Sequence, residues 1–278
     1  MDYKLLLIVP LLLLFGSIAI LVNGYVQTGE WFERSIELRG GTLITVNTDE
    51  QQDINSIEKQ LSEEFGAVIV KGLRGIGGYG IQIEVGSDAD SSRILEILSE
   101  YMDTSKSSIE SIEPALGETF WNQAQLGIIL AFIFMGIIVF AIFRSFVPSF
   151  AVILAAVSDI LVTLTLMQVF KIELTLAGLA SLLMLIGYSI DTDIMLTTRL
   201  LKRAGNLKEN INSAFKTGIT MTGTTLGALA VIYIVPTSPV ITEIASILLI
   251  GLVIDVIMTW LQNSVLLRWY VERRNVIC

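Results

Sequence analysis

The sequence has no histidine and a single cysteine, Cys278. Without histidine, the chain lacks the usual zinc ligand, the usual general base and the usual sensor of physiological pH. A lone cysteine cannot form a disulfide within the chain. We therefore expect no metal site, no cofactor and no enzymatic activity, and any proton chemistry must rest on carboxylates.

Charged residues are also scarce. They account for 16% of the 278 residues, whereas 53% are hydrophobic and the mean hydropathy is +0.70. Soluble proteins average about 25% charged residues, and they lack repeated apolar runs of about 18 residues or more, which are long enough to cross a bilayer. The composition thus indicates a polytopic α-helical membrane protein.

The charges that are present are unevenly distributed. Residues 26–118 contain 18 of the 27 acidic residues but only 7 of the 18 basic residues. An acidic soluble domain is therefore attached to a slightly basic membrane body. Because nucleic-acid binding requires a basic surface, this acidity argues against a nucleic-acid partner.

Six apolar stretches are expected to form transmembrane helices. They are Leu5–Val22, Gln125–Phe143, Val147–Phe170, Glu173–Thr198, Gly218–Val235 and Val240–Leu267. The first stretch can also be interpreted as a secretory signal, but no small-residue cleavage site follows it. We expect the first helix within residues 1–25, the soluble domain at 26–118, and the other five helices within 119–278.

Basic residues predict the orientation in the membrane. The connection at residues 199–216 carries five basic residues and one acidic residue. Lys4, Arg144 and the arginines near the C-terminus fall on the same side if the helices alternate. The positive-inside rule therefore places both termini in the cytoplasm and residues 26–118 outside the cytoplasmic membrane.

Residues 26–118 show the periodicities of a small α+β domain. Strand patterns follow the glycines of Ile36–Val46 and recur at Ala67–Val70, Gly80–Val85 and Ser107–Ile112. Helical patterns cover Asp53–Phe65 and Asp90–Met102. The order β-α-β-β-α-β is that of a ferredoxin-like domain.

A glycine motif in this domain could also be interpreted as a dinucleotide-binding site. Gly75-x-Gly77-x-x-Gly80 matches the letters of a dinucleotide-binding fingerprint. The fingerprint requires a helix directly after the glycines, and here a strand is expected. We therefore interpret the motif as a hairpin connection.

Three of the expected membrane helices carry aspartates: Asp159 in the third, Asp191 and Asp193 in the fourth, and Asp255 in the sixth. An intramembrane carboxylate costs roughly 2.5–3.5 kcal/mol on the insertion scale, and no lysine or arginine lies deep enough to pair with them. An acid that is neutral in lipid and ionises when water reaches it can carry a proton. The alternative is a purely structural hydrogen bond between helices. Three such helices in one domain favour a shared functional site.

The two aspartates of the fourth helix cannot both face that site. Successive helical residues turn by about 100°, so Asp191 and Asp193 lie about 200° apart. We expect Asp191, one turn after Gly187, to face the third, fifth and sixth helices. Asp193 would then point elsewhere, toward a partner subunit.

The fifth helix offers hydroxyl groups and small residues. Thr220 and Thr224 lie one turn apart and are candidates to relay protons, although plain packing is the alternative interpretation. Gly223 and Gly227, like Gly187, are expected to permit close helix packing. In the sixth helix a polar stripe suggests a face turned into the bundle: Asp255, Thr259, Gln262 and Asn263.

Several of these segments resemble the SecF proteins, which belong to the SecD/SecF family of protein-export membrane proteins. The stretch from Gly187 to Arg199, Gly-Tyr-Ser-Ile-Asp-Thr-Asp-Ile-Met-Leu-Thr-Thr-Arg, is similar to the family's fourth-helix motif, and Asp159 sits where the family has His-Asp. The Arg39-Gly40-Gly41 segment is similar to the one after the first helix. Pro114-Ala-Leu-Gly117 looks like the segment before the second. The Asp-Thr-Asp form resembles the archaeal branch.

The resemblance implies a fold and a function for the whole chain. The fold would be one six-helix half of an RND-type transporter, with a single domain outside the membrane. The chain would pair with SecD, work beside the Sec translocation channel on a translocating polypeptide, and couple export to the proton motive force. Two alternatives remain: an RND-type proton-driven transporter of small molecules or lipids, and a passive assembly partner whose acids only hold helices together.

Overall fold

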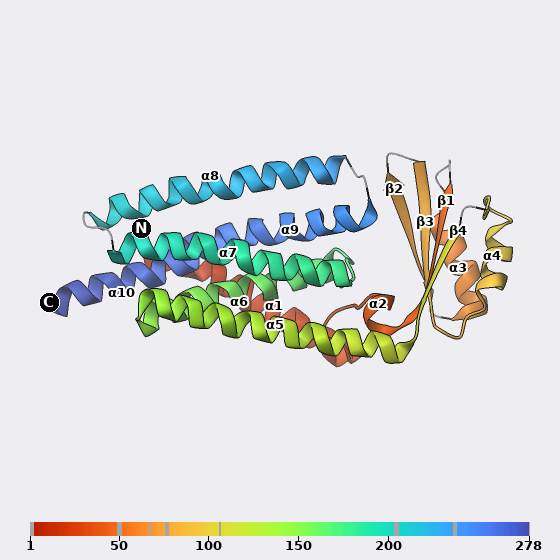
Figure 1. The fold of residues 1–278 in the computed structure, drawn as a ribbon, viewed down its shortest axis with the longest axis horizontal. Helices are drawn as coiled ribbons and strands as arrows, with labels where there is room; N and C mark the ends of the chain where they lie inside the picture. Colours follow the sequence, from red (N-terminus) through yellow and green to blue (C-terminus); the bar gives the residue numbers. More distant parts are fainter. Residues whose placement is uncertain are drawn as a thin grey trace.

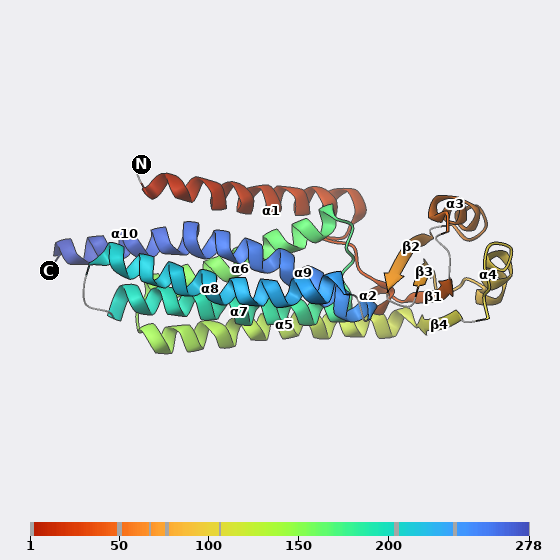
Figure 2. The ribbon, with the colours of Figure 1, turned by 90° about the horizontal axis from the view of Figure 1, so that it is seen from above.

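The computed structural model describes residues 3–48, 52–66, 68–75, 78–105, 107–202, 206–235 and 238–277. Within these residues, six helices are long and apolar enough to cross a membrane, which confirms the expected number of spans. The helices lie side by side as a long bundle, and a small sheet domain sits at one end (Figures 1 and 2). Helix α1 begins and helix α10 ends at the opposite end of the bundle (Figure 1).

The membrane body consists of the long helices. They are α1 (Ile8–Thr28), α5 (Pro114–Phe143), α6 (Phe146–Val169), α7 (Leu176–Lys202), α8 (Leu207–Ile234) and a last rod made of α9 (Pro239–Ile257), the π-helix η2 (Met258–Asn263) and α10 (Ser264–Ile277). A short 3₁₀ helix, η1 (Tyr3–Leu7), precedes α1. Proline stands at the start of both α5 and α9, where its missing N–H breaks no helical hydrogen bond.

Several expected boundaries differ from the structure. Helix α5 begins at Pro114, well before Gln125, so a domain boundary at residue 118 falls inside the helix. Helix α8 begins at Leu207, well before Gly218, so much of the expected connection at residues 199–216 is helical. Helix α1 continues to Thr28, past residue 25, before Gly29 ends it with a left-handed conformation. In each case, additional turns extend the helix beyond the apolar window that predicts the span.

The helices that carry aspartates in their middle form the centre of the bundle. Helices α6, α7 and α9 are the most buried of the six spans, whereas α1, α5 and α8 are largely exposed. Figure 2 shows α1 and α5 at opposite margins of the bundle. Asp159 of α6, Asp193 of α7 and Asp255 of α9 are buried in this centre.

The sheet domain has the predicted ferredoxin-like topology. Its elements are β1 (Gly41–Thr48), α3 (Ile54–Phe65), β2 (Ile69–Gly75), β3 (Gly78–Val85), α4 (Ser91–Leu98) and β4 (Ser107–Ile112). The strands lie in the order β2-β3-β1-β4, and all neighbours are antiparallel. Gly75 pairs with Gly78 across β2 and β3, so the glycine motif is a hairpin as predicted, although Gly77 lies outside the described residues.

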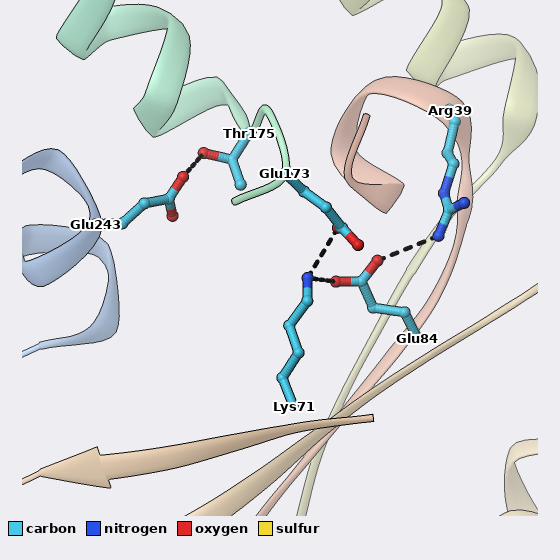
Figure 3. A network of polar contacts seen from close by, with 6 residues as sticks. All are labelled: Arg39, Lys71, Glu84, Glu173, Thr175 and Glu243. Atoms are coloured by element: carbon cyan, nitrogen blue, oxygen red, sulfur yellow. Dashed lines mark hydrogen bonds and ion pairs between the residues drawn. The ribbon is translucent and has the colours of Figure 1, made fainter. Parts of the chain in front are cut away.

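Alternation along the strands gives the sheet one apolar and one polar face. Ile44 pairs with Ile83, and both are fully buried under α3 and α4. Both helices begin at an aspartate cap, because Asp53 accepts from the Ser56 N–H and Asp90 from the Ser92 N–H. The opposite face of the sheet is polar, and there the side chains of Lys71 and Glu84 point toward the membrane body (Figure 3).

The two segments that resemble family motifs in the sheet domain form one junction. The short helix α2 (Ile36–Arg39) leads into Gly40 and Gly41, which have φ values of 83° and 145°. A Cβ on Gly40 would lie 2.4 Å from Pro114 Cα, and one on Gly117 would lie 2.6 Å from Gly40 N. Only glycine permits this approach, so the motifs join the start of β1 to the start of α5.

Candidate functional site within the membrane body

Three carboxyl groups meet in the middle of the bundle. Asp159 of α6, Asp193 of α7 and Asp255 of α9 expose 1%, 0% and 0% of their surface. They come from sequence positions up to 96 residues apart and meet because their three helices are mutual neighbours at the centre of the bundle. We call these three residues, together with Ser189, Thr259 and Asn263, the acid cluster.

Asp193 is held by two donors from the π-helix. Thr259 Oγ1 donates to Asp193 Oδ1 at 2.9 Å, and Asn263 Nδ2 donates to the same oxygen at 2.6 Å. A π-helix is rare and occurs mostly at functional sites. Here the π-helix carries Thr259 and Asn263, which donate hydrogen bonds to the carboxyl group of Asp193.

Thr259 also connects two of the acids. Its Oγ1 lies 3.2 Å from Asp255 Oδ1 as well as 2.9 Å from Asp193 Oδ1. A threonine hydroxyl has one hydrogen to donate and can accept a second hydrogen bond. Both contacts are therefore full hydrogen bonds only when one of the two carboxyl groups carries a proton and donates it to Thr259.

Asp159 is held on the other side of the cluster by a hydroxyl group of α7. Ser189 Oγ donates to Asp159 Oδ2 at 2.6 Å, and both residues are buried. Ser189 thus joins α6 to α7, and Thr259 joins α7 to α9.

The cluster has no counter-charge among the described residues. No described lysine or arginine forms an ion pair with its three acids, and no described set of acids is arranged to hold a metal ion. One oxygen of each acid receives no hydrogen bond from a described donor: Asp159 Oδ1, Asp193 Oδ2 and Asp255 Oδ2. Because an unpaired buried charge is costly, the arrangement favours bound protons.

The expectation for the two aspartates of α7 is reversed in the structure. Asp193 lies in the acid cluster, whereas Asp191 is on the exposed face of α7, so the prediction that Asp191 faces the other acids was wrong. Ser189, Asp193 and Leu196 define the buried side of α7. Each aspartate has one isoleucine neighbour and shares Thr192 as the other, so the sequence alone did not show which side of the helix packs inward.

The residues expected to help on α8 also face outward. Thr220 and Thr224 are exposed, and each donates to a backbone carbonyl of its own helix, at 2.8 Å. Gly187, Gly223 and Gly227 are exposed as well, and a Cβ on any of them would meet no described atom within 4 Å. The two threonines therefore do not reach the acid cluster. The close packing expected at these glycines involves no described atom of this chain and stays a prediction. A helix face made of small residues can pack against a helix of the same chain or against a helix of another subunit, and the sequence does not distinguish the two.

Other polar residues occupy the interior instead. The stripe of the last rod faces inward as predicted, since Thr259, Gln262 and Asn263 are buried. Gln262 Nε2 donates to Ser158 Oγ at 3.2 Å. Sequence analysis did not single out Ser189, although its position one turn before Asp193 was a signal that could have identified it.

Polar residues are also exposed on α7 and α8. Asp191 is exposed on α7, two turns before Arg199. Arg199 donates to Ser213 Oγ and Thr217 Oγ1 on α8, at 2.8 and 2.9 Å, and so ties this end of α7 to α8. A shallow depression on α8 is lined by Lys216, Thr217, Thr220, Met221 and Thr224. We call this surface, with Asp191 and the exposed glycines, the α7–α8 face.

Fold and site together define a polytopic membrane protein with a buried acid cluster and a ferredoxin-like domain between its first two spans. The family profile described as "Protein export membrane protein SecD/SecF, C-terminal" matches residues 94–273. The chain belongs to this family.

Relatives of known name agree with this assignment over nearly the whole chain. The "Protein-export membrane protein SecF" of Pyrococcus furiosus is 41% identical over 99% of this chain and 93% of its own length. The protein of the same name from Methanocaldococcus jannaschii is 37% identical over 97% of this chain and 96% of its own length.

Among solved structures, the crystal structure of SecDF, a translocon-associated membrane protein from Thermus thermophilus, has the same fold. It superposes with a TM-score of 0.78 at 19% identity over 98% of this chain. This chain spans 38% of that longer protein.

Proposed function

We propose that this chain is a SecF-like subunit that works with a SecD-like partner to assist protein export across the cytoplasmic membrane. The names of its relatives, which it matches over nearly their full length, support the export role. The likeness to SecDF, of which this chain spans 38%, supports a SecD-like partner. The Sec translocation channel and a translocating polypeptide would be the further partners.

The orientation is part of the proposal. The sheet domain lies outside the membrane and both termini lie in the cytoplasm. The basic residues near the end of the bundle away from the sheet domain, including Arg199 and Lys202 at the end of α7, support this placement under the positive-inside rule.

The acid cluster would couple export to the proton motive force. The observation that carries this is the hydroxyl of Thr259 between Asp193 and Asp255, an arrangement that is complete only with a bound proton. A proton that crosses 100 mV releases about 2.3 kcal/mol, and each pH unit adds about 1.4 kcal/mol. A few protons per cycle therefore suffice to move a small domain.

The partner would cover the α7–α8 face. Asp191 is exposed within a membrane span, where a carboxylate in contact with lipid costs roughly 2.5–3.5 kcal/mol. The neighbouring Gly223 and Gly227 would let a helix of another subunit approach closely. Contact with the SecD-like subunit would remove both the exposed charge and the exposed small residues from lipid.

Export in whole cells tests the proposal. The Asp193→Asn variant is expressed with the partner, and export of a secreted reporter is measured with and without a protonophore. We expect the variant to co-purify with the partner but to lose the protonophore-sensitive part of export. Glu110→Gln, at an exposed position of β4, is the matched control and should export normally.

Three outcomes would contradict the proposal. If the Asp193→Asn variant shows protonophore-sensitive export at the normal rate, the acid cluster has no part in coupling export to the proton motive force. Loss of the complex without any proton-dependent phenotype would favour the passive assembly partner. Ligand-dependent transport by the purified chain would instead favour the RND-type transporter.

A further inference from the structure

A network of charged residues joins the sheet domain to the membrane body (Figure 3). Lys71 of β2 lies between two carboxylates, with Nζ 2.9 Å from Glu84 Oε1 and 2.9 Å from Glu173 Oε2. Glu84, on β3, also pairs with Arg39 at 3.3 Å. Glu84 exposes 4% of its surface and Glu173 exposes 6%, so both acids are buried at the contact.

Glu173 belongs to the membrane body. It lies in the connection between α6 and α7, next to Leu174, whose backbone bonds to the sheet domain's entry segment. The Ser35 N–H donates to Leu174 O at 3.0 Å, and the Leu174 N–H donates to Glu33 O at 2.9 Å. The ion pair between Lys71 and Glu173 is therefore a contact across the interface between the domain and the body.

The same interface reaches the first turns of the central helices. Glu37 of α2 accepts the Leu176 N–H at 2.7 Å, and Thr175 accepts the Gly178 N–H at 2.8 Å. Thr175 Oγ1 in turn donates to Glu243 Oε1 of α9 at 2.5 Å. Movement of the sheet domain would therefore act directly on the first turns of α7 and α9. Further along, α7 carries Asp193 and α9 carries Asp255.

Acidic groups outnumber basic groups around Glu173. Those that face it or lie in the same network are Lys71 of β2, Glu84 of β3, Arg39 and Glu37 of α2, and Glu243 of α9. With Glu173 ionised, four carboxylates meet two cations. One proton added to Glu173 reduces this excess of negative charge.

We propose that this network is a proton-responsive latch, in which the sheet domain docks on the membrane body when Glu173 is protonated and loosens when Glu173 is ionised. The latch goes beyond the proposed function, because docking of the domain requires neither export nor proton flow through the acid cluster. Its failure and the failure of proton-coupled export are therefore observed separately.

The electrostatics of the docked state support the direction of this response. Burial, and then repulsion by Glu84, raise the pKa of Glu173 to about 7, although Lys71 opposes the shift. Burial lowers the pKa of Lys71, but the attraction of Glu84 and Glu173 outweighs it, so that the net pKa is raised and Lys71 stays charged. When the domain undocks, Glu173 returns to water and to an ordinary pKa of about 4.3.

The docked state therefore binds the proton more tightly than the undocked state. By linkage, the contribution of Glu173 to docking is fully present below about pH 4 and is lost as the pH rises through the docked pKa. Between pH 6 and pH 8, a docked pKa of about 7 predicts a roughly tenfold fall in the ratio of docked to undocked protein.

Hydrogen exchange on the full chain in nanodiscs measures this ratio. The amides of Ser35 and Leu174 bond across the interface and become accessible when the domain undocks. After correction for the intrinsic exchange rate, we expect their protection to fall about tenfold from pH 6 to pH 8. Equal protection at both pH values would overturn the proposal.

Matched variants test whether Glu173 is the responsible group. Glu173→Gln keeps the shape of the side chain without its charge, so protection should remain at its pH 6 level throughout the range. Lys71→Met removes the cation that favours the ionised form, and the midpoint should move to higher pH. Glu63→Gln, at an exposed position of α3, should behave as the unaltered chain.

A distance measurement provides an independent readout. Spin labels are attached to Asn47→Cys in β1 and Val240→Cys in α9, two exposed positions, in a Cys278→Ser background. We expect one narrow distance distribution at pH 6 and a second, broader population at pH 8. A full pH response that persists in Glu173→Gln would assign it to another group and overturn the latch as proposed.

Discussion

Asn263 Nδ2 donates to Asp193 Oδ1 at 2.6 Å, which ties the last turn of a π-helix to an acid in the middle of α7. Both residues are fully buried. The contact places Asp193 beside Thr259 and Asp255, and it makes α7 and the last rod one unit. This unit, rather than Asp191, is the centre of the proton chemistry that we propose.

The hydroxyl of Thr259 should be essential for coupling. Thr259→Val keeps the volume of the side chain but removes the group that Asp193 and Asp255 share. Leaving buried acceptors unsatisfied costs about 1–3 kcal/mol, so the thermal unfolding midpoint should fall and protonophore-sensitive export should be lost. Thr259→Ser retains the hydroxyl and should retain export. Equal export by both variants would show that the hydroxyl has no part in coupling.

Substitutions on the two sides of α7 should separate coupling from assembly. Asp191→Leu removes the exposed carboxylate of the α7–α8 face and leaves the acid cluster intact. We expect co-purification with the partner to change, measured as the amount of partner retained per unit of chain, while the isolated chain stays folded. Asp193→Asn should retain the partner in the same assay. Loss of the partner with Asp193→Asn alone would contradict our assignment of the two faces.

Glycines with different surroundings should tolerate alanine differently. A Cβ on Gly117 would lie 2.6 Å from Gly40 N, so Gly117→Ala should destabilise the junction by about 1–3 kcal/mol, the usual cost of overpacking. Gly223→Ala meets no described atom within 4 Å and should leave the unfolding midpoint of the isolated chain unchanged. If Gly223 contacts the partner, the same variant should weaken co-purification. Unfolding curves of the two purified variants provide the comparison.

Removal of Glu84 should shift the latch in a direction opposite to that of Lys71→Met. Repulsion by Glu84 is one of the two causes that raise the pKa of Glu173, so Glu84→Gln should lower that pKa toward its ordinary value. Lys71 would then pair with Glu173 alone. The pH midpoint of Ser35 and Leu174 protection should therefore fall. A rise of the midpoint would mean that Glu84 acts on Glu173 chiefly by holding Lys71 in place.

Much of the fold is present in the sequence pattern. The length and apolar composition of six stretches predict six spans, because a bilayer admits few other structures. Alternation and helical spacing in residues 26–118 predict the β-α-β-β-α-β order. The polar stripe of the last rod correctly predicts an inward face.

Contacts between distant residues, in contrast, are decided only by the tertiary structure. On α7, polar residues such as Ser181 and Thr197 are buried while Leu183 is exposed, so periodicity does not define which side is buried. Packing against α6 and α9 brings Asp193 inward and leaves Asp191 exposed. The π-helix has no evident signal in the sequence, yet it brings Thr259 and Asn263 to Asp193. Likewise, Lys71 and Glu173 are 102 residues apart, and they pair because the sheet domain packs against the membrane body. The sequence by itself determines which groups can carry charge in the membrane, whereas the rotation and packing of the helices decide which of them meet.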